Sequence, residues 1–260
     1  MAQQSDVIDY KIIGDDMQAV IVTLDPNEQV IAEAGGMLFM TQGIEMQTSM
    51  STDKGKGFFG NLLKAAGRVM TGESFFITTF TNAGNARADV AFAAPYPGRI
   101  VPLELGKMGG TMICQKDAFL CAARGTDVTI AFQKKLGVGL FGGEGFILQK
   151  LTGDGLAFVH AGGMVFKKTL GQGEQIRIDT GCIVAFVPSV NYDIQFVGGF
   201  KNALFGGEGL FFATLTGPGE VYLQTLPFSR LADRIKSAVL RGGKDEGSVI
   251  GGLGSLFKSS

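Results

Sequence analysis

The chain repeats one phrase three times, and this repeat limits the folds that the chain can adopt. Residues 140–155 read LFGGEGFILQKLTGDG and residues 204–219 read LFGGEGLFFATLTGPG, while a shorter copy, TGESFFITTFTNAG, covers residues 71–84. Aligned glycines at Gly72, Gly143 and Gly207 set the copies 71 and 64 residues apart. A repeat of this length is too long for a solenoid rung but long enough for a small β-sandwich.

A second phrase repeats with the first and defines the extent of each unit. Residues 176–196 match residues 112–132 at an offset of 64, and residues 30–48 match them more weakly at an offset of 82. We therefore expect three similar units with boundaries near residues 95 and 161. The predicted domains are 1–95 with a helical insertion at 54–70, 96–160, 161–226, and a helix and tail at 227–260.

Local patterns predict β-strands within each unit. Residues 175–179 alternate polar and apolar side chains, which is typical of a half-buried strand. Residues 75–77 and 210–212 are short apolar runs near glycines, which indicates strands buried on both faces. Glycine-containing turns follow, and we expect them to supply the positive φ of tight hairpins; they lie at 82–84, 153–155 and 217–219.

Two segments carry helical rather than strand periodicity. Residues 58–70 place apolar side chains at helical spacing with Lys64 and Arg68 opposite them. Residues 228–240 do the same, with Ser229 as a candidate N-cap and Gly242 as a candidate stop. The predicted fold class is all-β, with three β-sandwich subdomains in a pseudo-threefold arrangement and a C-terminal amphipathic helix.

Composition narrows the function classes. The 23 basic and 24 acidic residues nearly cancel, so we expect no nucleic-acid partner. Three cysteines without a CxxC spacing, no signal-like N-terminus and no apolar stretch long enough to span a bilayer favour a reduced, cytoplasmic protein.

Sequence motifs for catalysis and cofactors are weak. His160 is the single histidine, so we expect an ordinary hydrogen-bonded strand residue rather than a metal ligand or a catalytic base. Gly137, Gly139 and Gly142 form a GxGxxG, but an apolar strand follows where a dinucleotide site needs a helix. We therefore expect no cofactor and no enzymatic activity.

One glutamate recurs in every unit, as Glu73, Glu144 and Glu208. Three such carboxylates could converge on a cation such as Mg²⁺ or Ca²⁺. Alternatively, each carboxylate accepts hydrogen bonds from amides of its own glycine loop and fixes the turn. The threefold recurrence favours the structural role, because a structural device repeats with its unit.

The loops before these glutamates are the best candidates for a contact surface, since each joins lysines to apolar side chains on a glycine-rich segment. This combination suits a membrane interface or a protein groove. Alternatively, the phenylalanines close the end of each unit and the lysines are solvated. The predicted contact residues are Lys134, Lys135, Phe141, Lys201, Phe205, Phe58 and Phe59.

The paired LFGGEG phrases, the GES-FF copy and the AEAGGMLFM turn resemble the altered-inheritance-of-mitochondria family over roughly residues 5–225. The resemblance implies β-sandwich units similar to the tryptophan-RNA-binding attenuation protein. It does not imply binding of RNA or tryptophan, and no catalytic residues come with it. Prokaryotic members of the family are of unknown function, and the mitochondrial relatives are linked to inner-membrane organisation.

We therefore expect a non-enzymatic scaffold or binding module that acts at a membrane surface or on a protein partner and forms a homo-oligomer. Its expected location is cytoplasmic or peripheral to a membrane. The alternative is a protein that binds a small ligand or metal, or an enzyme, with its site between the repeats.

Overall fold

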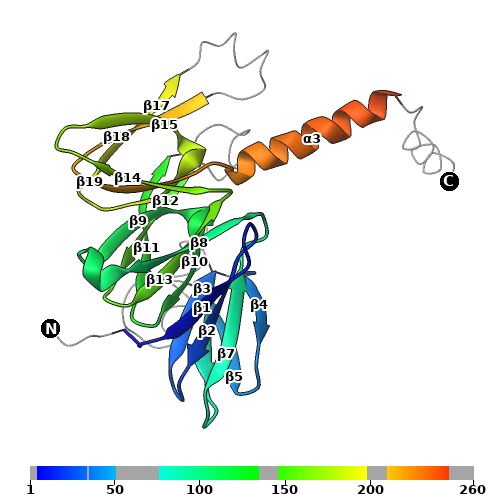
Figure 1. Cartoon of the computed structure of the whole chain (residues 1–260), viewed down its shortest axis with the longest axis vertical. Coiled ribbons are helices and arrows are strands. Elements are labelled where there is room, and N and C mark those ends of the chain that lie inside the picture. Colours follow the sequence, from blue (N-terminus) through cyan, green and yellow to red (C-terminus); the bar gives the residue numbers. More distant parts are fainter. Residues whose placement is uncertain (1–4, 34, 51–75, 135–145, 198–209, 246–260) are drawn as a thin grey trace.

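The computed structural model describes residues 5–33, 35–50, 76–134, 146–197 and 210–245. Within these residues the chain forms four antiparallel β-sheets and one C-terminal helix, α3 (Phe228–Asp245) (Figure 1). The all-β class and the C-terminal helix are thus confirmed. The predicted helix at 58–70 lies outside the described residues.

The four sheets, A to D, are built from strands in the following orders. Sheet A is β1 (Asp9–Ile13), β2 (Ala19–Leu24), β7 (Ala88–Ala93) and β4 (Met37–Met40). Sheet B is β5 (Ile44–Met50), β6 (Phe76–Asn82), β3 (Gln29–Glu33), β10 (Phe119–Ala123), β13 (Leu156–Gly162) and β8 (Gly98–Glu104). Sheet C is β11 (Asp127–Lys134), β12 (Phe146–Thr152), β9 (Thr111–Gln115), β16 (Ile183–Phe186), β19 (Gly219–Gln224) and β14 (Val165–Leu170). Sheet D is β15 (Gln175–Asp179), β18 (Leu210–Thr216) and β17 (Asn191–Val197).

The strand orders repeat from one unit to the next. Three strands pair as β2-β7-β4 in unit 1, β8-β13-β10 in unit 2 and β14-β19-β16 in unit 3. The other three pair as β5-β6-β3, β11-β12-β9 and β17-β18-β15. Each unit therefore places half of its strands in one sheet and half in the next, and β1 is an addition to unit 1.

Successive units share a sheet. In sheet B, β3 of unit 1 pairs with β10 of unit 2, with Ala32 opposite Cys121. In sheet C, β9 of unit 2 pairs with β16 of unit 3, with Cys114 opposite Ala185. Both junctions are antiparallel and continue the hydrogen-bonded ladder from one unit into the next.

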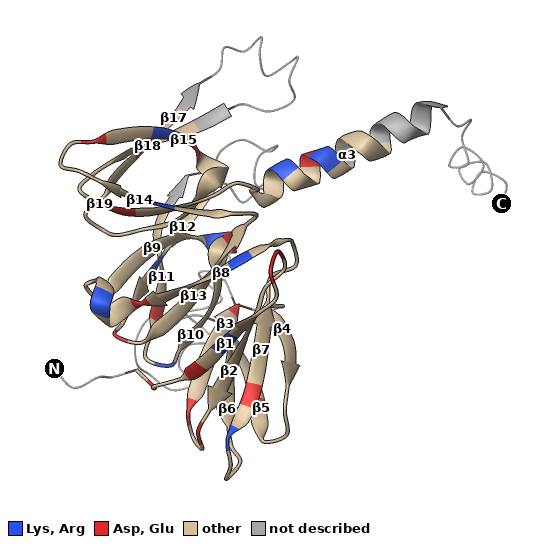
Figure 2. Cartoon of the chain, in the orientation of Figure 1, with Lys and Arg blue, Asp and Glu red and all other residues tan. Residues whose placement is uncertain are grey.

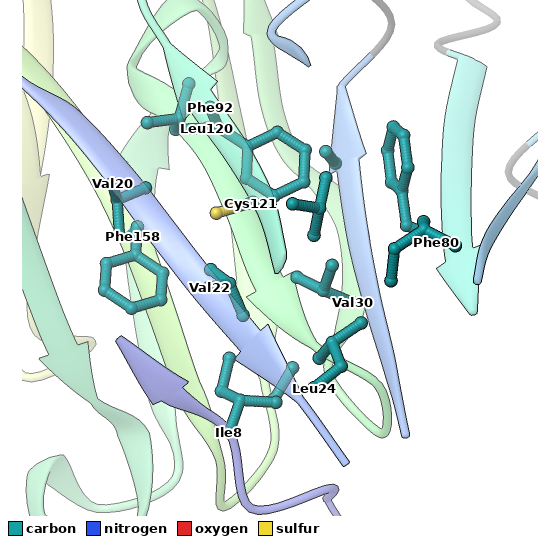
Figure 3. Close-up of a cluster of buried hydrophobic side chains, with 14 of the residues drawn as sticks. Ile8, Val20, Val22, Leu24, Val30, Phe80, Phe92, Leu120, Cys121 and Phe158 are labelled. Atoms are coloured by element: carbon teal, nitrogen blue, oxygen red, sulfur yellow. The ribbon is translucent and has the colours of Figure 1, made fainter. Parts of the chain in front are cut away.

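Three hydrophobic cores lie between the four sheets. The first joins sheets A and B, and its side chains include Val22 and Phe92 from sheet A and Val30 and Phe158 from sheet B (Figure 3). The second lies between sheets B and C and the third between sheets C and D. Because sheets B and C are covered on both faces, their central strands are continuous apolar runs, such as FLCAA in β10 and IVAF in β16.

The units follow one another along the long axis of the molecule (Figure 1). A closed threefold arrangement would bring β15 of unit 3 against β4 of unit 1, and the described strands contain no such pair. The predicted pseudo-threefold arrangement is therefore not confirmed. The pattern of the repeat does not specify whether the last unit returns to the first, because this depends on the rotation between successive units.

Two local predictions were wrong. The turns at 82–84, 153–155 and 217–219 join strands of neighbouring sheets rather than hairpin partners, and of their glycines only Gly219 has a positive φ. These turns cross between stacked sheets about 10 Å apart, so tight hairpin geometry is not required. Helix α3 begins at Phe228, which places Ser229 in its first turn, and it continues past Gly242 to Asp245.

Short 3₁₀ turns connect several strands. They cover Leu105–Met108, Lys116–Ala118 and Thr180–Cys182. The last two occupy equivalent places, between β9 and β10 and between β15 and β16.

Candidate functional site

The predicted contact loops join equivalent hairpins in the three units. The strand ends that carry them are Met50 opposite Phe76, Lys134 opposite Phe146, and Val197 opposite Leu210. Lys134 is thus the last residue of β11, and its contact role stays a prediction. The other contact residues lie outside the described part of the chain: Lys135, Phe141, Lys201, Phe205, Phe58 and Phe59.

The repeated glutamates also lie outside the described residues, so both interpretations of Glu73, Glu144 and Glu208 stay predictions. Among the residues that the structure describes, no three His, Cys, Asp or Glu side chains are grouped so as to hold a metal ion.

His160 is buried on β13, where it lies opposite Ile100 of β8. Its ring and that of Tyr96 form a T-shaped pair, with centroids 4.6 Å apart and planes at 87°. Its Nδ1 has no hydrogen-bond partner among the described residues. Burial lowers the pKa of His160 to about 4, so the ring is neutral near pH 7.

Gly98 leaves room for the ring of His160, and a glutamine takes the place of this histidine in unit 3. A Cβ at Gly98 would lie 2.5 Å from Nε2 of His160, so the ring occupies the space that a side chain there would take. In unit 3 the equivalent of His160 is Gln224, which accepts a hydrogen bond from the Gly162 amide and donates one to the Gly181 carbonyl, both at 2.7 Å. Gln224 thereby joins unit 3 to the end of unit 2.

The cysteines are held as thiols. Cys114 and Cys121 are buried, and desolvation raises the pKa of each well above its usual value. Cys182 is half-buried, and burial also raises its pKa, against the opposing effect of Arg230. A raised thiol pKa leaves little of the reactive thiolate, which is consistent with a packing role.

Helix α3 is anchored to the β-sheets at its first turn. Arg230 Nη2 donates to Asp179 Oδ2 of β15 at 2.8 Å, and the ring of Phe228 lies 5.4 Å from that of Tyr96. The amides of Arg230 and Leu231 donate to the Pro227 carbonyl and begin the helix. Beyond this turn, the helix projects away from the sheets (Figure 1).

The projecting helix carries an exposed apolar stripe. Phe228, Leu231, Ile235 and Val239 share one face by helical spacing, and Ile235 and Val239 are 57% and 69% exposed. The helix segment has five basic and two acidic residues. Figure 2 shows Lys or Arg and Asp alternating on its described part.

A second exposed apolar surface lies on β4. All four of its residues, Met37, Leu38, Phe39 and Met40, are exposed, although they are apolar and form a strand. The sequence pattern did not indicate this segment as a surface. Only the order of strands shows that β4 lies at the edge of sheet A.

Within the described residues, no helix combines the length and the apolar character that crossing a bilayer requires.

Comparison with known proteins places the chain in a family. Residues 10–226 match the family described as "Mitochondrial biogenesis AIM24". An uncharacterized protein of Streptococcus pyogenes serotype M6 is 32% identical over 241 residues, which cover 90% of this chain and 94% of that protein. A crystal structure of a Streptococcus pyogenes protein superposes with a TM-score of 0.70 at 28% identity and covers 89% of this chain and 99% of the other. The chain therefore belongs to the mitochondrial biogenesis AIM24 family, as its repeated phrases indicated.

Proposed function

We propose that this protein is a non-enzymatic scaffold that attaches peripherally to an anionic membrane surface on the cytoplasmic side, through helix α3. The loops predicted as contacts, which include Lys134, Lys135, Phe141, Lys201 and Phe205, would add basic and apolar contacts to the same surface.

The observation that carries the proposal is the exposed stripe of α3. Beyond its first turn, α3 leaves its apolar face in water among the described residues, which is unfavourable by about 25 cal/mol for each Å² of apolar surface. Ile235 and Val239 are more than half exposed on such a face. Insertion of this face at the headgroup boundary would bury it without a helix long enough to span the bilayer.

The charge of the helix favours attachment to an anionic membrane surface over an uncharged one. The helix has a net charge of +3 from its five basic and two acidic residues, although the whole chain carries −1. Basic side chains near an anionic surface each contribute about 1 kcal/mol to attachment. Electrostatic attraction would thus orient the molecule with α3 toward the membrane.

The titratable groups of the described region support a role without catalysis. Desolvation keeps the single histidine and both buried cysteines neutral near pH 7, because it disfavours their charged forms. Such neutral, buried groups are not poised to transfer protons or attack a substrate.

Vesicle co-sedimentation tests the proposal. We expect the full chain to sediment with vesicles that contain an anionic phospholipid, and less with purely zwitterionic vesicles. Ile235→Glu should weaken anionic vesicle binding by at least about tenfold, because it replaces a buried apolar contact of about 1.5–3 kcal/mol with a repelled carboxylate.

Ser237→Glu is the matched control, because Ser237 is also exposed but lies on the opposite face of α3. It adds the same charge and should reduce binding much less. Equal losses in the two variants, or a wild-type chain that ignores anionic vesicles, would contradict the proposal. In the latter case the stripe would be a site for a protein partner.

A further inference from the structure

The two outermost sheets, A and D, each lack the strands of a second unit that the inner sheets B and C contain. Sheets B and C each combine three strands of one unit with three strands of the next. Sheet A contains only the first set of unit 1, together with β1, and sheet D contains only the second set of unit 3. Each outer sheet is therefore half of the composite sheet found at both internal junctions.

The two half-sheets end in the strands that make these junctions elsewhere. The equivalents of β4, which are β10 and β16, pair with β3 and β9 of the preceding unit. The equivalents of β15, which are β3 and β9, make the other side of the same junctions. Several further strands lie at sheet edges, but β4 and β15 are the two whose equivalents are paired across units.

Strand β4 is exposed at a position where its equivalents in β10 and β16 are buried. A register shift occurs at Leu38 in β4, at Leu120 in β10 and at Val184 in β16, so these three residues correspond. Leu120 and Val184 are 4% and 0% exposed, whereas Leu38 is 56% exposed. The strand has kept both the apolar side chains and the backbone irregularity of a junction strand, and no charged residue protects it as an edge.

Strand β15 is also less buried than its equivalents in the other units. Ile176 and Ile178 are only half-buried, while their equivalents in β9, Met112 and Cys114, are fully buried. Within one chain β15 cannot meet β4, because sheets A and D are separated by sheets B and C, which corresponds to about 30 Å at about 10 Å for each intersheet spacing. Figure 1 shows β15 in the upper part of the molecule and β4 at the side of its lower part.

We infer that two copies of this chain join head to tail, with β15 of one copy pairing antiparallel with β4 of the next. The new sheet would combine sheet D of one copy with sheet A of the other and repeat the arrangement of sheets B and C. Because the two surfaces differ, the contact is heterologous, and repetition gives a ring or an open row.

The internal junctions also fix the register. Strands β3, β9 and β15 begin at residues 29, 111 and 175, and strands β4, β10 and β16 begin at 37, 119 and 183, so both sets have offsets of 82 and 64. Ala32 opposite Cys121 and Cys114 opposite Ala185 obey these offsets. The same rule places Ile178 of one copy opposite Phe39 of the next, and Arg177 opposite Met40.

Cysteine pairs test this register. The equivalents of Ile178 and Phe39 in unit 2 are Cys114 and Cys121, so cysteine suits both positions. Phe39→Cys and Ile178→Cys chains, each with Cys182→Ser, should form a disulfide-linked dimer when mixed and oxidised, because directly opposed strand residues have Cα atoms within disulfide range. Neither variant alone should form one.

The matched control mixes Phe39→Cys with Arg177→Cys, which is shifted by one residue and points to the other face of the sheet. This mixture should give several-fold less dimer. Equal yields in both mixtures, or dimers of Phe39→Cys alone, would overturn the proposal, since the latter outcome indicates pairing of two β4 strands.

Sedimentation velocity of the full chain gives an independent test. We expect the wild-type chain to form species larger than a monomer, and Leu38→Asp to weaken association at least about tenfold, because a junction would bury the new carboxylate. Leu38 is exposed in the single chain, so the variant chain should still fold. A monomeric wild-type chain, or undiminished association of a folded Leu38→Asp chain, would refute the proposed contact.

Discussion

His160 and Gln224 occupy one position of the repeat but respond differently to acid. His160 is buried beside Tyr96 with its pKa lowered to about 4, from an ordinary value near 6.5. Between these values the unfolded chain binds a proton that the folded chain does not, so stability falls as the pH decreases. Gln224 at the equivalent place has no such proton.

Acidification should therefore destabilise the protein through His160. The contribution is fully present above pH 6.5 and is lost as the pH falls toward 4, which amounts to about 2 kcal/mol by pH 5. Urea unfolding at pH 7.5 and pH 5 measures this loss as a difference in the free energy of unfolding.

His160→Gln is the control, because unit 3 already uses glutamine at this position. The variant should show a smaller loss between the two pH values than the wild-type chain. An equal loss in both proteins would mean that carboxylates elsewhere dominate the acid response and that His160 does not.

At the scale of elements, the ion pair between Arg230 and Asp179 is the polar anchor of α3 on the sheets. Because the Arg230 side chain is about half exposed, the pair is screened by solvent and contributes little to global stability. Its expected effect is local, on the docking of the first helical turn.

Arg230→Gln should speed amide hydrogen exchange in the first two turns of α3 and leave the melting temperature of the sheets nearly unchanged. Arg234→Gln, which removes the same charge one turn later on an exposed side chain, should change exchange less. Exchange that is unaltered by Arg230→Gln would show that the contact of Phe228 with Tyr96 holds the helix by itself.

Elements differ in how far the sequence could predict them. Strand β15 was predicted with its observed limits, because Ile176 and Ile178 alternate with polar residues on a sheet with one exposed face. The apolar stripe of α3 was predicted for the same kind of reason, whereas its C-terminal limit was not, because the helix continues through Gly242 although helices commonly end at glycine. The exposure of Met37–Met40 could not be predicted, since an apolar strand looks the same whether it lies inside a sheet or at its edge.

At the scale of the whole molecule, the offsets of the repeat predict the three units but not how the units are arranged in space. The sequence shows that β3, β9 and β15 are equivalent. It does not show that β3 and β9 pair with a strand of the following unit while β15 lies at the edge of its sheet. The candidate binding loops were found by composition alone, and nothing in the described residues tests Lys134, Phe141 or Phe205 as contacts.

Assembly and membrane attachment should be coupled if both proposals hold. A row of copies presents several α3 helices to one surface, and linked contacts bind far more tightly than single ones. Leu38→Asp should therefore weaken co-sedimentation with anionic vesicles by at least about tenfold, although Leu38 is not part of α3. The Ile235→Glu chain should still assemble in solution, and loss of assembly in that variant would show that α3 itself forms the contact between copies.

The difference between the two open edges has a genetic consequence. A Leu38→Asp copy keeps an intact β15, so it can join the β4 edge of a normal copy, yet no further copy can follow it. Leu38→Asp copies would thus join the rows of normal copies and stop their growth. In a cell that expresses both forms, the substitution should behave as dominant, whereas a simple loss of the protein from one of two gene copies would only halve its amount.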